Sequence, residues 1–370
     1  AIGENFGEDS SSVSSLLNSG VIDIVSTHGA FAALKNDGSV VTWGLARDGG
    51  DSSGISDQLS SGVNKIYSTN YSFVALKNDG SVVTWGFDKK AGQIDYLWGP
   101  WTSNGENGNS NVLESGVSKV CTISDGYFAA IKTDGSVVVW GWGTPGVWLQ
   151  EEDPDVIRFV EISDQLSSGV VNIFSTGRAA AALKSDGSVV TWGEKITGGD
   201  SNSVISQISS DVINISANAY SFAALKSDGS VITWGDNARG GDSSLVSDDL
   251  SSGVQKIYGS RDTFAALKDD GSVISWGQYQ SISDLGSVTT SWESVKDQLS
   301  NGVIDVVHNG QSDAWAALKS DGSVVTWGRN DYGGDSTNVM GPDWTLNGTT
   351  SGDQLSNGIV ALNNIFTDEI

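Results

Sequence analysis

The sequence predicts an all-β fold made of seven similar units, and three observations support this. Close copies of the segment from Phe222 to Gly235, Phe-Ala-Ala-Leu-Lys-Ser-Asp-Gly-Ser-Val-Ile-Thr-Trp-Gly, occur seven times. Their tryptophans are 42 to 55 residues apart, close to the length of a propeller blade. Each copy has two apolar runs typical of strands around a turn signal. We therefore predict a seven-bladed β-propeller, with a solenoid of stacked repeats as the structural alternative. The copies span residues 31–44, 73–86, 128–141, 180–193, 222–235, 264–277 and 315–328.

Each copy is predicted to be a β-hairpin. In the fifth copy the strands cover residues 222–225 and 231–234, and Asp228-Gly229 lies between them. Asp-Gly is favoured where a tight turn needs a positive φ. The first run is apolar throughout instead of alternating, so both faces of this strand should be buried between stacked sheets. The small side chains of Ala223 and Ala224 would let neighbouring sheets approach closely.

A second signature, Asp-Gln-Leu-Ser-Ser-Gly-Val-x-x-Ile, precedes the hairpins and is clearest at residues 57–66 and 164–173. We expect Val-x-x-Ile to form a strand that pairs with the apolar run behind it. We expect the Asp-Gln-Leu part to form a fourth, irregular edge. Each unit would then have about four strands, as a propeller blade has.

Additional residues follow Trp-Gly in three units and after the last hairpin. Strand direction places these segments, and the turns that follow Val-x-x-Ile, at one edge of the sheets. The Asp-Gly turns lie at the opposite edge and hardly change from copy to copy. Variation on a regular scaffold marks the first edge as the place for binding loops. The added segments are residues 87–111, 142–163, 278–296 and 329–351.

The composition limits the partners. The chain has 45 acidic and 20 basic residues, a formal charge of −25, and seven lysines belong to the repeated hairpins. Neither nucleic acid nor an anionic membrane surface is an expected partner for such a chain. No run of about 18 apolar residues occurs, so membrane insertion is not expected. Cys121 stands alone in an apolar strand, where a small buried residue is expected rather than a nucleophile.

The ends of the chain leave two alternatives. We expect residues 1–370 to form one propeller domain, with seven repeat units within 13–328 and a closing or overhanging segment at 329–370. Residues 353–367 repeat Asp-Gln-Leu-Ser-Asn-Gly and Leu-x-x-Ile with no hairpin behind them. Either one end overlaps the other to close the ring, or the chain is part of a longer array. A start at Ala1 without a methionine fits removal of a signal peptide or excision from a longer polypeptide.

The motif Ala-Leu-x-x-Asp-Gly-x-Val-x-x-Trp-Gly, extended to Trp-Gly-x-Asn-x-x-Gly at 234–240 and 327–333, resembles the regulator of chromosome condensation repeat family. The resemblance covers about residues 13–328 and implies a seven-bladed propeller that binds proteins through its loops. The short units are most similar to bacterial secreted members such as the propeller-type β-lactamase inhibitor proteins. Where eukaryotic members often continue Gly-Gln-Leu-Gly, this chain has Gly-Gly-Asp-Ser, and it has no basic tail. We therefore transfer no residues for nucleotide exchange on a small nuclear GTPase.

The sequence contains none of the common motifs of catalytic sites. The sequence has no Gly-x-Ser-x-Gly elbow, P-loop or dinucleotide fingerprint, so we predict that the chain is not an enzyme. His28 and His308, without cysteine partners, make a poor zinc site. No cofactor or metal is expected. Weak Ca²⁺ binding is the alternative for recurring aspartates in glycine-rich loops, although such residues more often cap turns. These aspartates are Asp51, Asp200, Asp242 and Asp335.

Aromatic residues in the variable segments are the strongest functional signal. Six tryptophans lie there, and they either pack the loops onto the blades or present rigid anchors to a partner. Tyrosines and arginines of the variable turns complete the predicted contact surface. The predicted partner-binding residues are Trp98, Trp101, Trp142, Trp148, Trp292, Trp344, Tyr71, Tyr127, Arg178, Tyr220 and Arg261.

These patterns predict a non-catalytic, extracellular or cell-surface, protein-binding propeller. The centre of the contact is expected at the four tryptophans of the first two insertions. A structural or adhesive segment of a larger surface assembly is one alternative, and a glycan-binding module is another. The Asp-Gly edge repeats Lys-x-Asp-Gly-Ser and offers little to recognise, so charge reversal of Lys77, Lys132 and Lys226 should leave binding nearly unchanged.

Overall fold

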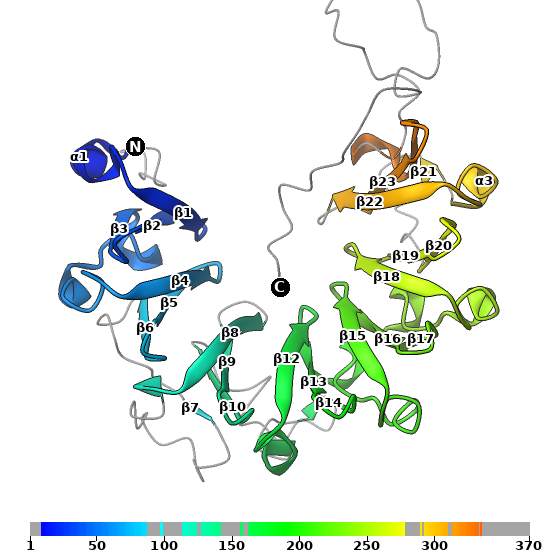
Figure 1. Ribbon diagram of the computed structural model, residues 1–370, viewed down its shortest axis with the longest axis horizontal. Helices are drawn as coiled ribbons and strands as arrows, with labels where there is room; N and C mark the ends of the chain where they lie inside the picture. The colour runs from blue at the N-terminus through cyan, green and yellow to red at the C-terminus, as the bar shows by residue number, and fades with distance from the viewer. Residues whose placement is uncertain are drawn as a thin grey trace, which may run out of the picture. The chain divides into compact units, whose positions relative to one another are not determined.

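The computed structural model describes residues 9–86, 97–98, 113–123, 127–141, 156–157, 162–277, 289–290, 292–309, 313–332 and 334. The chain forms two compact units, residues 1–173 and 174–370, with the division inside strand β12 (Val170–Ser175). Both units are built from antiparallel sheets of one design (Figure 1). No helix in the described residues is long and apolar enough to cross a membrane.

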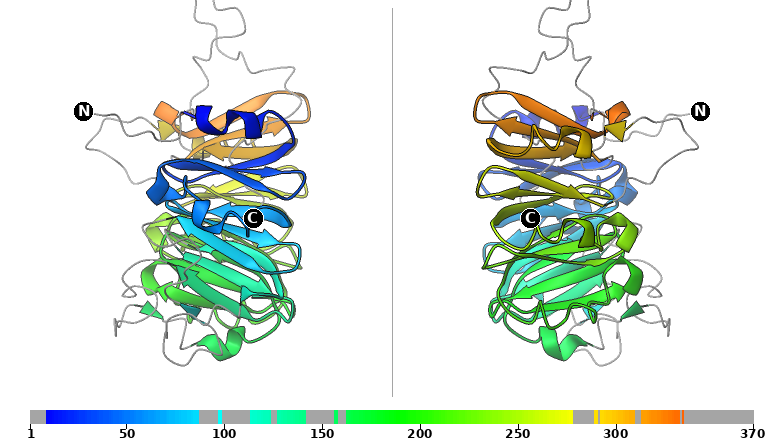
Figure 2. Two further views of the ribbon diagram at one scale, coloured as in Figure 1. Left: turned by 90° about the vertical axis from the view of Figure 1, so that its left-hand side faces the viewer. Right: turned by 90° about the vertical axis from the view of Figure 1, so that its right-hand side faces the viewer.

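The described residues form seven sheets, one for each repeat, and these confirm the predicted all-β, seven-bladed propeller class. In each sheet the Val-x-x-Ile strand pairs with the apolar strand, and the apolar strand pairs with the Trp-Gly strand. Figure 2 shows the ribbon from two further sides. The first strands are β1 (Val21–Ser26), β4 (Val63–Ser68), β8 (Val117–Ile123), β12, β15 (Val212–Ala217), β18 (Val254–Gly259) and β22 (Val303–Asn309). The middle strands are β2 (Ala30–Lys35), β5 (Ser72–Lys77), β9 (Tyr127–Lys132), β13 (Ala179–Lys184), β16 (Ser221–Lys226), β19 (Phe264–Lys268) and β23 (Ala314–Lys319). The third strands are β3 (Val40–Gly44), β6 (Val82–Gly86), β10 (Val137–Gly141), β14 (Val189–Glu194), β17 (Val231–Gly235), β20 (Val273–Trp276) and β24 (Val324–Arg329).

Short helical turns connect the sheets. Those of the first unit are η1 (Ser11–Val13), α1 (Ser14–Leu17), η2 (Ala46–Asp48), η3 (Ser53–Ile55) and η6 (Ser163–Leu166). Those of the second unit are η7 (Lys195–Thr197), η8 (Asn237–Arg239), η9 (Ser244–Val246), α3 (Trp292–Val295) and η10 (Asn330–Tyr332).

The middle strand is buried on both faces, as its unbroken apolar run predicts. Ala223 and Ala224 on β16 have no exposed surface, and Phe222 pairs in register with Trp234 on β17. The two rings stack with centroids 5.2 Å apart. The tryptophan Nε1 donates to the Gly198 carbonyl of the preceding connection, so the indole joins two neighbouring blades by packing and by a hydrogen bond.

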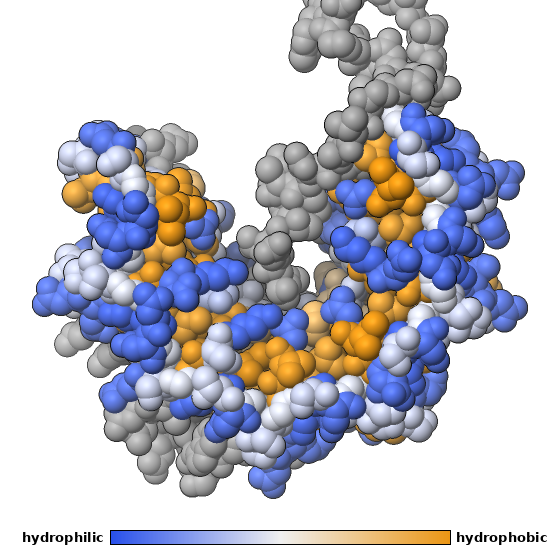
Figure 3. Space-filling model, viewed as in Figure 1, coloured by the Kyte–Doolittle hydropathy of each residue, from blue (hydrophilic) through white to orange (hydrophobic). Residues whose placement is uncertain are grey.

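The first strand is covered on one face only. In β15, Val212 and Ile215 are buried while Ile213, between them, is 57% exposed. The same second position is exposed at Ile304 in β22. Figure 3 shows apolar surface over several first strands. In six of the seven described first strands the Val-x-x-Ile spacing therefore marks the covered face; the exception is β1, where Ile24 is 56% exposed.

The hairpin turn requires its glycine twice. Gly229 has a φ of 78°, which L side chains rarely adopt, and a Cβ there would lie 2.7 Å from the Gly253 nitrogen of the next connection. Asp228 completes the turn, because its Oδ1 accepts hydrogen bonds from the Ser230 nitrogen and hydroxyl. Those hydrogen bonds, the hydroxyl's first, lower the pKa of Asp228. The Asp-Gly-Ser sequence thus forms the turn and the contact with the next blade together.

The expected fourth edge at Asp-Gln-Leu is wrong, because this segment forms helical turns instead of a strand. Leu250 is buried, and its carbonyl accepts a hydrogen bond from the Val231 nitrogen at the start of the preceding third strand. A fourth strand does occur in three sheets, but the inserted segments supply it. These strands are β7 (Leu97–Trp98), β11 (Val156–Ile157) and β21 (Thr289–Thr290), which lie beside β10, β14 and β24.

Replacing Trp234 by alanine should lower the free energy of unfolding by about 3 to 5 kcal/mol, because a buried indole leaves a cavity between two blades. Urea denaturation measures the loss. Leu245, 99% exposed, is the matched control, and its replacement by alanine should change stability by less than about 0.5 kcal/mol. A Trp234→Ala loss no larger than that of the control would contradict the packing described above.

The repeated hairpin lysine has a structural contact that the sequence did not reveal. Lys226 Nζ donates to the Gln207 carbonyl at 2.9 Å, and Lys77, Lys268 and Lys319 bind the equivalent carbonyls. Each lysine therefore closes the helical turn in front of its own blade. Charge reversal at these positions removes hydrogen-bond donors as well as changing the surface charge.

The variant Lys226→Met should consequently be less stable than wild type by about 1 kcal/mol, since it keeps the aliphatic stem but loses the charged donor. Ser227→Ala, at the exposed neighbouring position, should be close to neutral. Thermal and urea unfolding of both variants would show the difference. Equal stability of Lys226→Met and wild type would mean that this bond is replaced by water at no cost.

Candidate protein-binding surface

Two kinds of turn meet at the edge opposite the Asp-Gly turns. One follows the first strand and the other follows Trp-Gly. Together we call them the variable edge. In the first unit, Thr27 Oγ1 donates to the Asp48 carbonyl at 2.9 Å, and in the second unit Thr176 Oγ1 donates to the Thr197 carbonyl at 3.2 Å. These bonds confirm that both turns lie at one edge, as strand direction predicts.

In the first, fourth and fifth blades the side chain at the first position of the variable turn caps that turn: Thr27 Oγ1, for example, accepts the Ala30 nitrogen. Thr176 Oγ1 also accepts the Ala179 nitrogen. In the next blade Asn218 takes over this role: its Oδ1 accepts the Tyr220 and Ser221 nitrogens, and its Nδ2 donates to the Arg239 carbonyl at 2.7 Å. Between these two blades, variation at this position is therefore a change of cap that leaves the turn in place.

Backbone bonds at the second position link neighbouring turns. The Gly177 nitrogen donates to the Ala219 carbonyl at 2.9 Å, and the Ala219 nitrogen donates to the Arg261 carbonyl at 3.1 Å. In the first unit the His28 nitrogen donates to the Asn70 carbonyl in the same way. The second and third positions of successive turns thus form an ordered row of side chains on a connected backbone.

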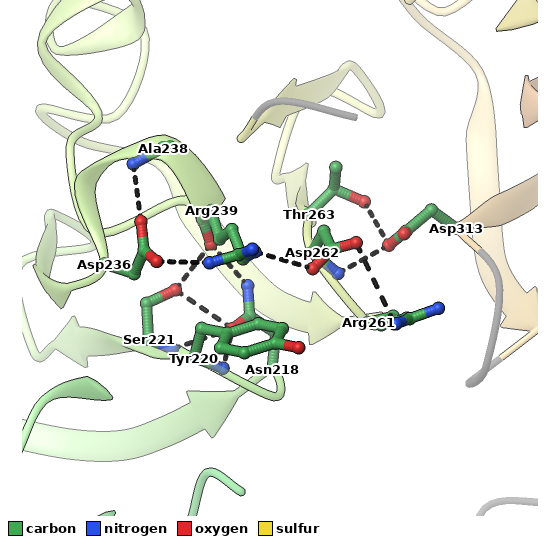
Figure 4. Close-up of polar contacts among 10 residues, drawn as sticks. All are labelled: Asn218, Tyr220, Ser221, Asp236, Ala238, Arg239, Arg261, Asp262, Thr263 and Asp313. Carbon is green, nitrogen blue, oxygen red and sulfur yellow. Dashed lines mark hydrogen bonds and ion pairs between the residues drawn. The ribbon is translucent and has the colours of Figure 1, made fainter. Parts of the chain in front are cut away.

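The best-defined part of this row surrounds Arg239, in the turn after Trp234-Gly235 (Figure 4). Its guanidinium lies 2.5 Å from Asp236 Oδ2 and 3.2 Å from Asp262 Oδ1, and it covers the Tyr220 ring at 4.1 Å. Three neighbouring segments therefore hold one arginine in place. Sequence reasoning missed Arg239, although the Asp-x-x-Arg spacing of residues 236–239 was a signal for the local ion pair.

Asp262 lies between this arginine and a second carboxylate. Asp313, nearly fully buried and with a φ of 52°, accepts the Asp262 nitrogen at 2.8 Å and the Thr263 hydroxyl at 3.0 Å. Trp315 Nε1 in turn donates to the Thr263 hydroxyl. Burial raises the pKa of Asp262 to about 6, and the charge of Asp313 adds to this while Arg261 and Arg239 oppose it.

Four of the predicted binding residues lie on the variable edge as expected. In the first unit, Tyr71 is 41% exposed and its ring lies 6.4 Å from that of His28. In the second unit the side chains of Arg178 and Arg261 are 64% and 49% exposed, and Tyr220 is half-buried under Arg239. These residues occupy the second and third turn positions, which do not cap the turn.

Two predicted residues are buried instead. Trp292, on α3, is 7% exposed, packs in the core of its unit and donates from Nε1 to the Val273 carbonyl at 3.3 Å. It packs its insertion against a blade, which was one of the two alternatives for the loop tryptophans. Tyr127 is also buried, because it is the first residue of strand β9 and belongs to the sheet and not to the variable turn. Of Trp98 only the backbone is described, in β7, and Trp101, Trp142, Trp148 and Trp344 lie outside the described residues.

The aspartates considered for Ca²⁺ cap turns. Asp51, Asp200 and Asp242 each accept the backbone nitrogen two residues ahead, while Asp335 lies outside the described residues. His308 packs on Trp315 with ring centroids 5.0 Å apart, and burial lowers its pKa. In the described part of the chain, no group of three or more histidine, cysteine or acidic residues is placed to hold a metal ion.

The raised pKa of Asp262 predicts a pH-dependent effect of Asp262→Asn. Because the folded pKa lies above the ordinary value of 3.8, the stabilising contribution of the protonated group is present below that value and is lost as pH rises through 6. As pH rises from 4 to 7, the free energy of unfolding of the variant should therefore increase relative to that of wild type by about 1 to 2 kcal/mol.

Asp242→Asn is the control with the opposite sign. The Ser244 nitrogen lowers the pKa of Asp242, so its contribution is present above the ordinary value and is lost as pH falls. This variant should lose stability relative to wild type as pH rises. Urea unfolding of both variants at pH 4 and pH 7 tests the pair, and a trend of the same sign in both would rule out the account given for Asp262.

Comparison with known proteins supports the repeat assignment. The model of the regulator of chromosome condensation (RCC1) repeat matches residues 212–240, which are β15 to β17 and the turn that carries Arg239. No curated protein sequence matches the chain. The CRINKLY WD40 ectodomain of the receptor kinase ACR4 from Arabidopsis thaliana is a similar solved structure, 16% identical, with coverage of 91% of this chain and 99% of its own and a TM-score of 0.39.

Two further similar structures are Prp20p from Saccharomyces cerevisiae and human WBSCR16. Prp20p, described with its binding properties to Gsp1p and histones, is 13% identical and covers 92% of this chain and 77% of its own, with a TM-score of 0.38. WBSCR16 is 14% identical and covers 70% and 77%, with a TM-score of 0.40. The other six blades repeat the strands and turns of residues 212–240, the segment that matches the regulator of chromosome condensation repeat.

Proposed function

We propose that this chain is a non-catalytic protein-binding propeller that contacts its partner through the variable edge. The observation that carries the proposal is a division between the two edges. At the Asp-Gly edge, the repeated lysine, aspartate and serine side chains form bonds within the fold. At the variable edge, the capping positions hold the backbone, while exposed side chains differ from blade to blade.

The arginines strengthen this proposal. All six arginines of the sequence follow either a first strand or a Trp-Gly pair, whereas seven of the fourteen lysines lie in the Asp-Gly hairpins. Arginine and tyrosine are enriched in the residues that dominate binding energy at protein interfaces. The six are Arg47, Arg158, Arg178, Arg239, Arg261 and Arg329.

The variable edge of the second unit is also ordered before any partner arrives. Arg239 is fixed by two carboxylates and by the Tyr220 ring, and the turn backbones are bonded to one another. A surface that is ordered in advance loses less conformational entropy on association than a mobile one. Arg178 and Arg261, on either side of this centre, keep exposed guanidinium groups that a partner can bind.

Affinity capture from the native surroundings, followed by calorimetry with the recovered protein, tests the proposal. Arg178→Ala, Arg261→Ala and Tyr71→Ala should each cost about 1 to 2 kcal/mol of binding free energy, as should Ala substitution of the loop tryptophans of the first two insertions where these are hot spots. Ser185→Glu and Ser227→Glu, exposed on the Asp-Gly edge, are the controls and should bind normally. If only the control variants lose binding, the partner contacts the Asp-Gly edge and the proposal is wrong.

The alternatives are separated by what is recovered. Capture of a carbohydrate polymer that is released by free sugar would favour the glycan-binding alternative. Covalent or end-to-end continuity with a much longer surface polypeptide would favour the structural or adhesive one. We also propose an extracellular or cell-surface location, which protease treatment of intact cells tests, since only a protein outside the membrane would be digested.

A further inference from the structure

The contact between consecutive blades follows one rule, seen clearly between the sixth and seventh blades of the second unit. Residues 297–303, Asp-Gln-Leu-Ser-Asn-Gly-Val, pack against the hairpin of the sixth blade. The Val273 nitrogen donates to the Leu299 carbonyl, and the Val303 nitrogen donates to the Gly271 carbonyl, both at 2.9 Å. Leu299 is fully buried, and a Cβ on Gly271 would lie 2.8 Å from the Gly302 nitrogen.

The same contact recurs in both units. In each case the valine after Ser-Gly, Ser-Asp or Asn-Gly donates its backbone nitrogen to the carbonyl of the glycine in the preceding hairpin turn. Because the bond depends on backbone atoms and a glycine turn, it requires only the two short sequence motifs. The pairs are Val63 with Gly38, Val117 with Gly80 and Val170 with Gly135 in the first unit, and Val212 with Gly187, Val254 with Gly229 and Val303 with Gly271 in the second.

The seventh blade carries the receiving half of this contact. Its hairpin reads Lys-Ser-Asp-Gly-Ser-Val at residues 319–324, against Lys-Asp-Asp-Gly-Ser-Val at 268–273 in the sixth. Gly322 has a φ of 82°, as the other hairpin glycines have. Ala316 is partly exposed, whereas its counterpart in the sixth blade, Ala265, has no exposed surface. The chain that follows this blade beyond Gly334 lies outside the described residues.

Besides the segment that precedes the first blade, the donating half occurs once more in the sequence. Residues 353–358 are Asp-Gln-Leu-Ser-Asn-Gly, identical to residues 297–302, and Ile359 stands where Val303 does. The connection is long enough, since Leu355 follows Trp327 by 28 residues, the interval that also separates Leu113 from Trp85. Leu113 is buried against the second blade across that interval.

We propose that residues 353–362 dock on the seventh blade of the same chain, as an eighth copy of the segment that joins one blade to the next. In this arrangement Leu355 fills the apolar site beside Val324 and its carbonyl accepts the Val324 nitrogen. The Ile359 nitrogen donates to the Gly322 carbonyl, and Leu362 occupies the place that Val306 has against the sixth blade. The segment covers the apolar face of the seventh blade without needing a hairpin of its own.

Hydrogen exchange at the Val324 amide tests this docking in the full chain. Leu355→Asp should speed that exchange at least tenfold, because it removes the segment that protects the amide. Ser356→Asp, at the position of the exposed Ser300, is the matched control and should leave exchange unchanged. The Val273 amide in the sixth blade should stay protected in both variants. Leu355→Ala, a milder change, gives the same readout if the aspartate variant unfolds the whole unit.

Other occupants of this face give different results. If Leu355→Asp and Leu355→Ala leave the Val324 amide as protected as in wild type, the segment does not dock there and the proposal is overturned. If Leu17→Asp, in the corresponding segment of the first blade, exposes Val324 instead, that segment is the occupant. If protection at Val324 falls on dilution, a second copy of the chain supplies the cover, which equally overturns docking within one chain.

Discussion

The close approach of two glycine-containing turns is the constraint on which the blades of each unit depend. A hairpin glycine such as Gly229 supplies the positive φ and leaves room for the backbone of the next connection, where a Cβ would come within 2.7 Å of a nitrogen. The same approach places the Val254 nitrogen on the Gly229 carbonyl. Strand pairing, the buried leucine of Asp-Gln-Leu and the tryptophan that joins neighbouring connections all require this spacing, so one turn sets the distance between sheets.

Sequence reasoning found what local pattern determines. Apolar runs around Asp-Gly predict every hairpin, and strand direction predicts which turns share an edge. It failed where the outcome depends on distant partners. Asp-Gln-Leu forms a helical turn because Leu250 and its carbonyl both reach the preceding blade. Trp292 is buried because α3 lies beside β24 of the seventh blade and the indole Nε1 donates to the Val273 carbonyl of the sixth. The place of Arg239 depends on Asp262 from another blade, which no local spacing reveals.

Repetition alone does not show which positions of the two edges are structural and which are available for binding. The Asp-Gly edge repeats the same residues because their side chains form hydrogen bonds within the fold, as Lys226 and Asp228 do. A varied surface can still contain fixed elements, as the capping positions Thr176 and Asn218 show. Variation is therefore informative for binding only at positions whose side chains do not hold the turn, and at the variable edge these are the second and third positions.

The acidity of the chain also has a structural share. Each hairpin aspartate from Asp37 to Asp321 accepts the serine two residues ahead, and the hydroxyl bond, followed by the backbone bond, lowers its pKa. A group with a lowered folded pKa stabilises the fold above its ordinary pKa, and the contribution is lost as pH falls. Seven such groups, one per hairpin, act in the same direction. Seven of the 45 acidic side chains thus close hairpin turns in the ionised state, and the net charge of −25 keeps the surface hydrated. The acidity of this chain is therefore explained in part by the structure of its turns, and it is not by itself an indication of a ligand.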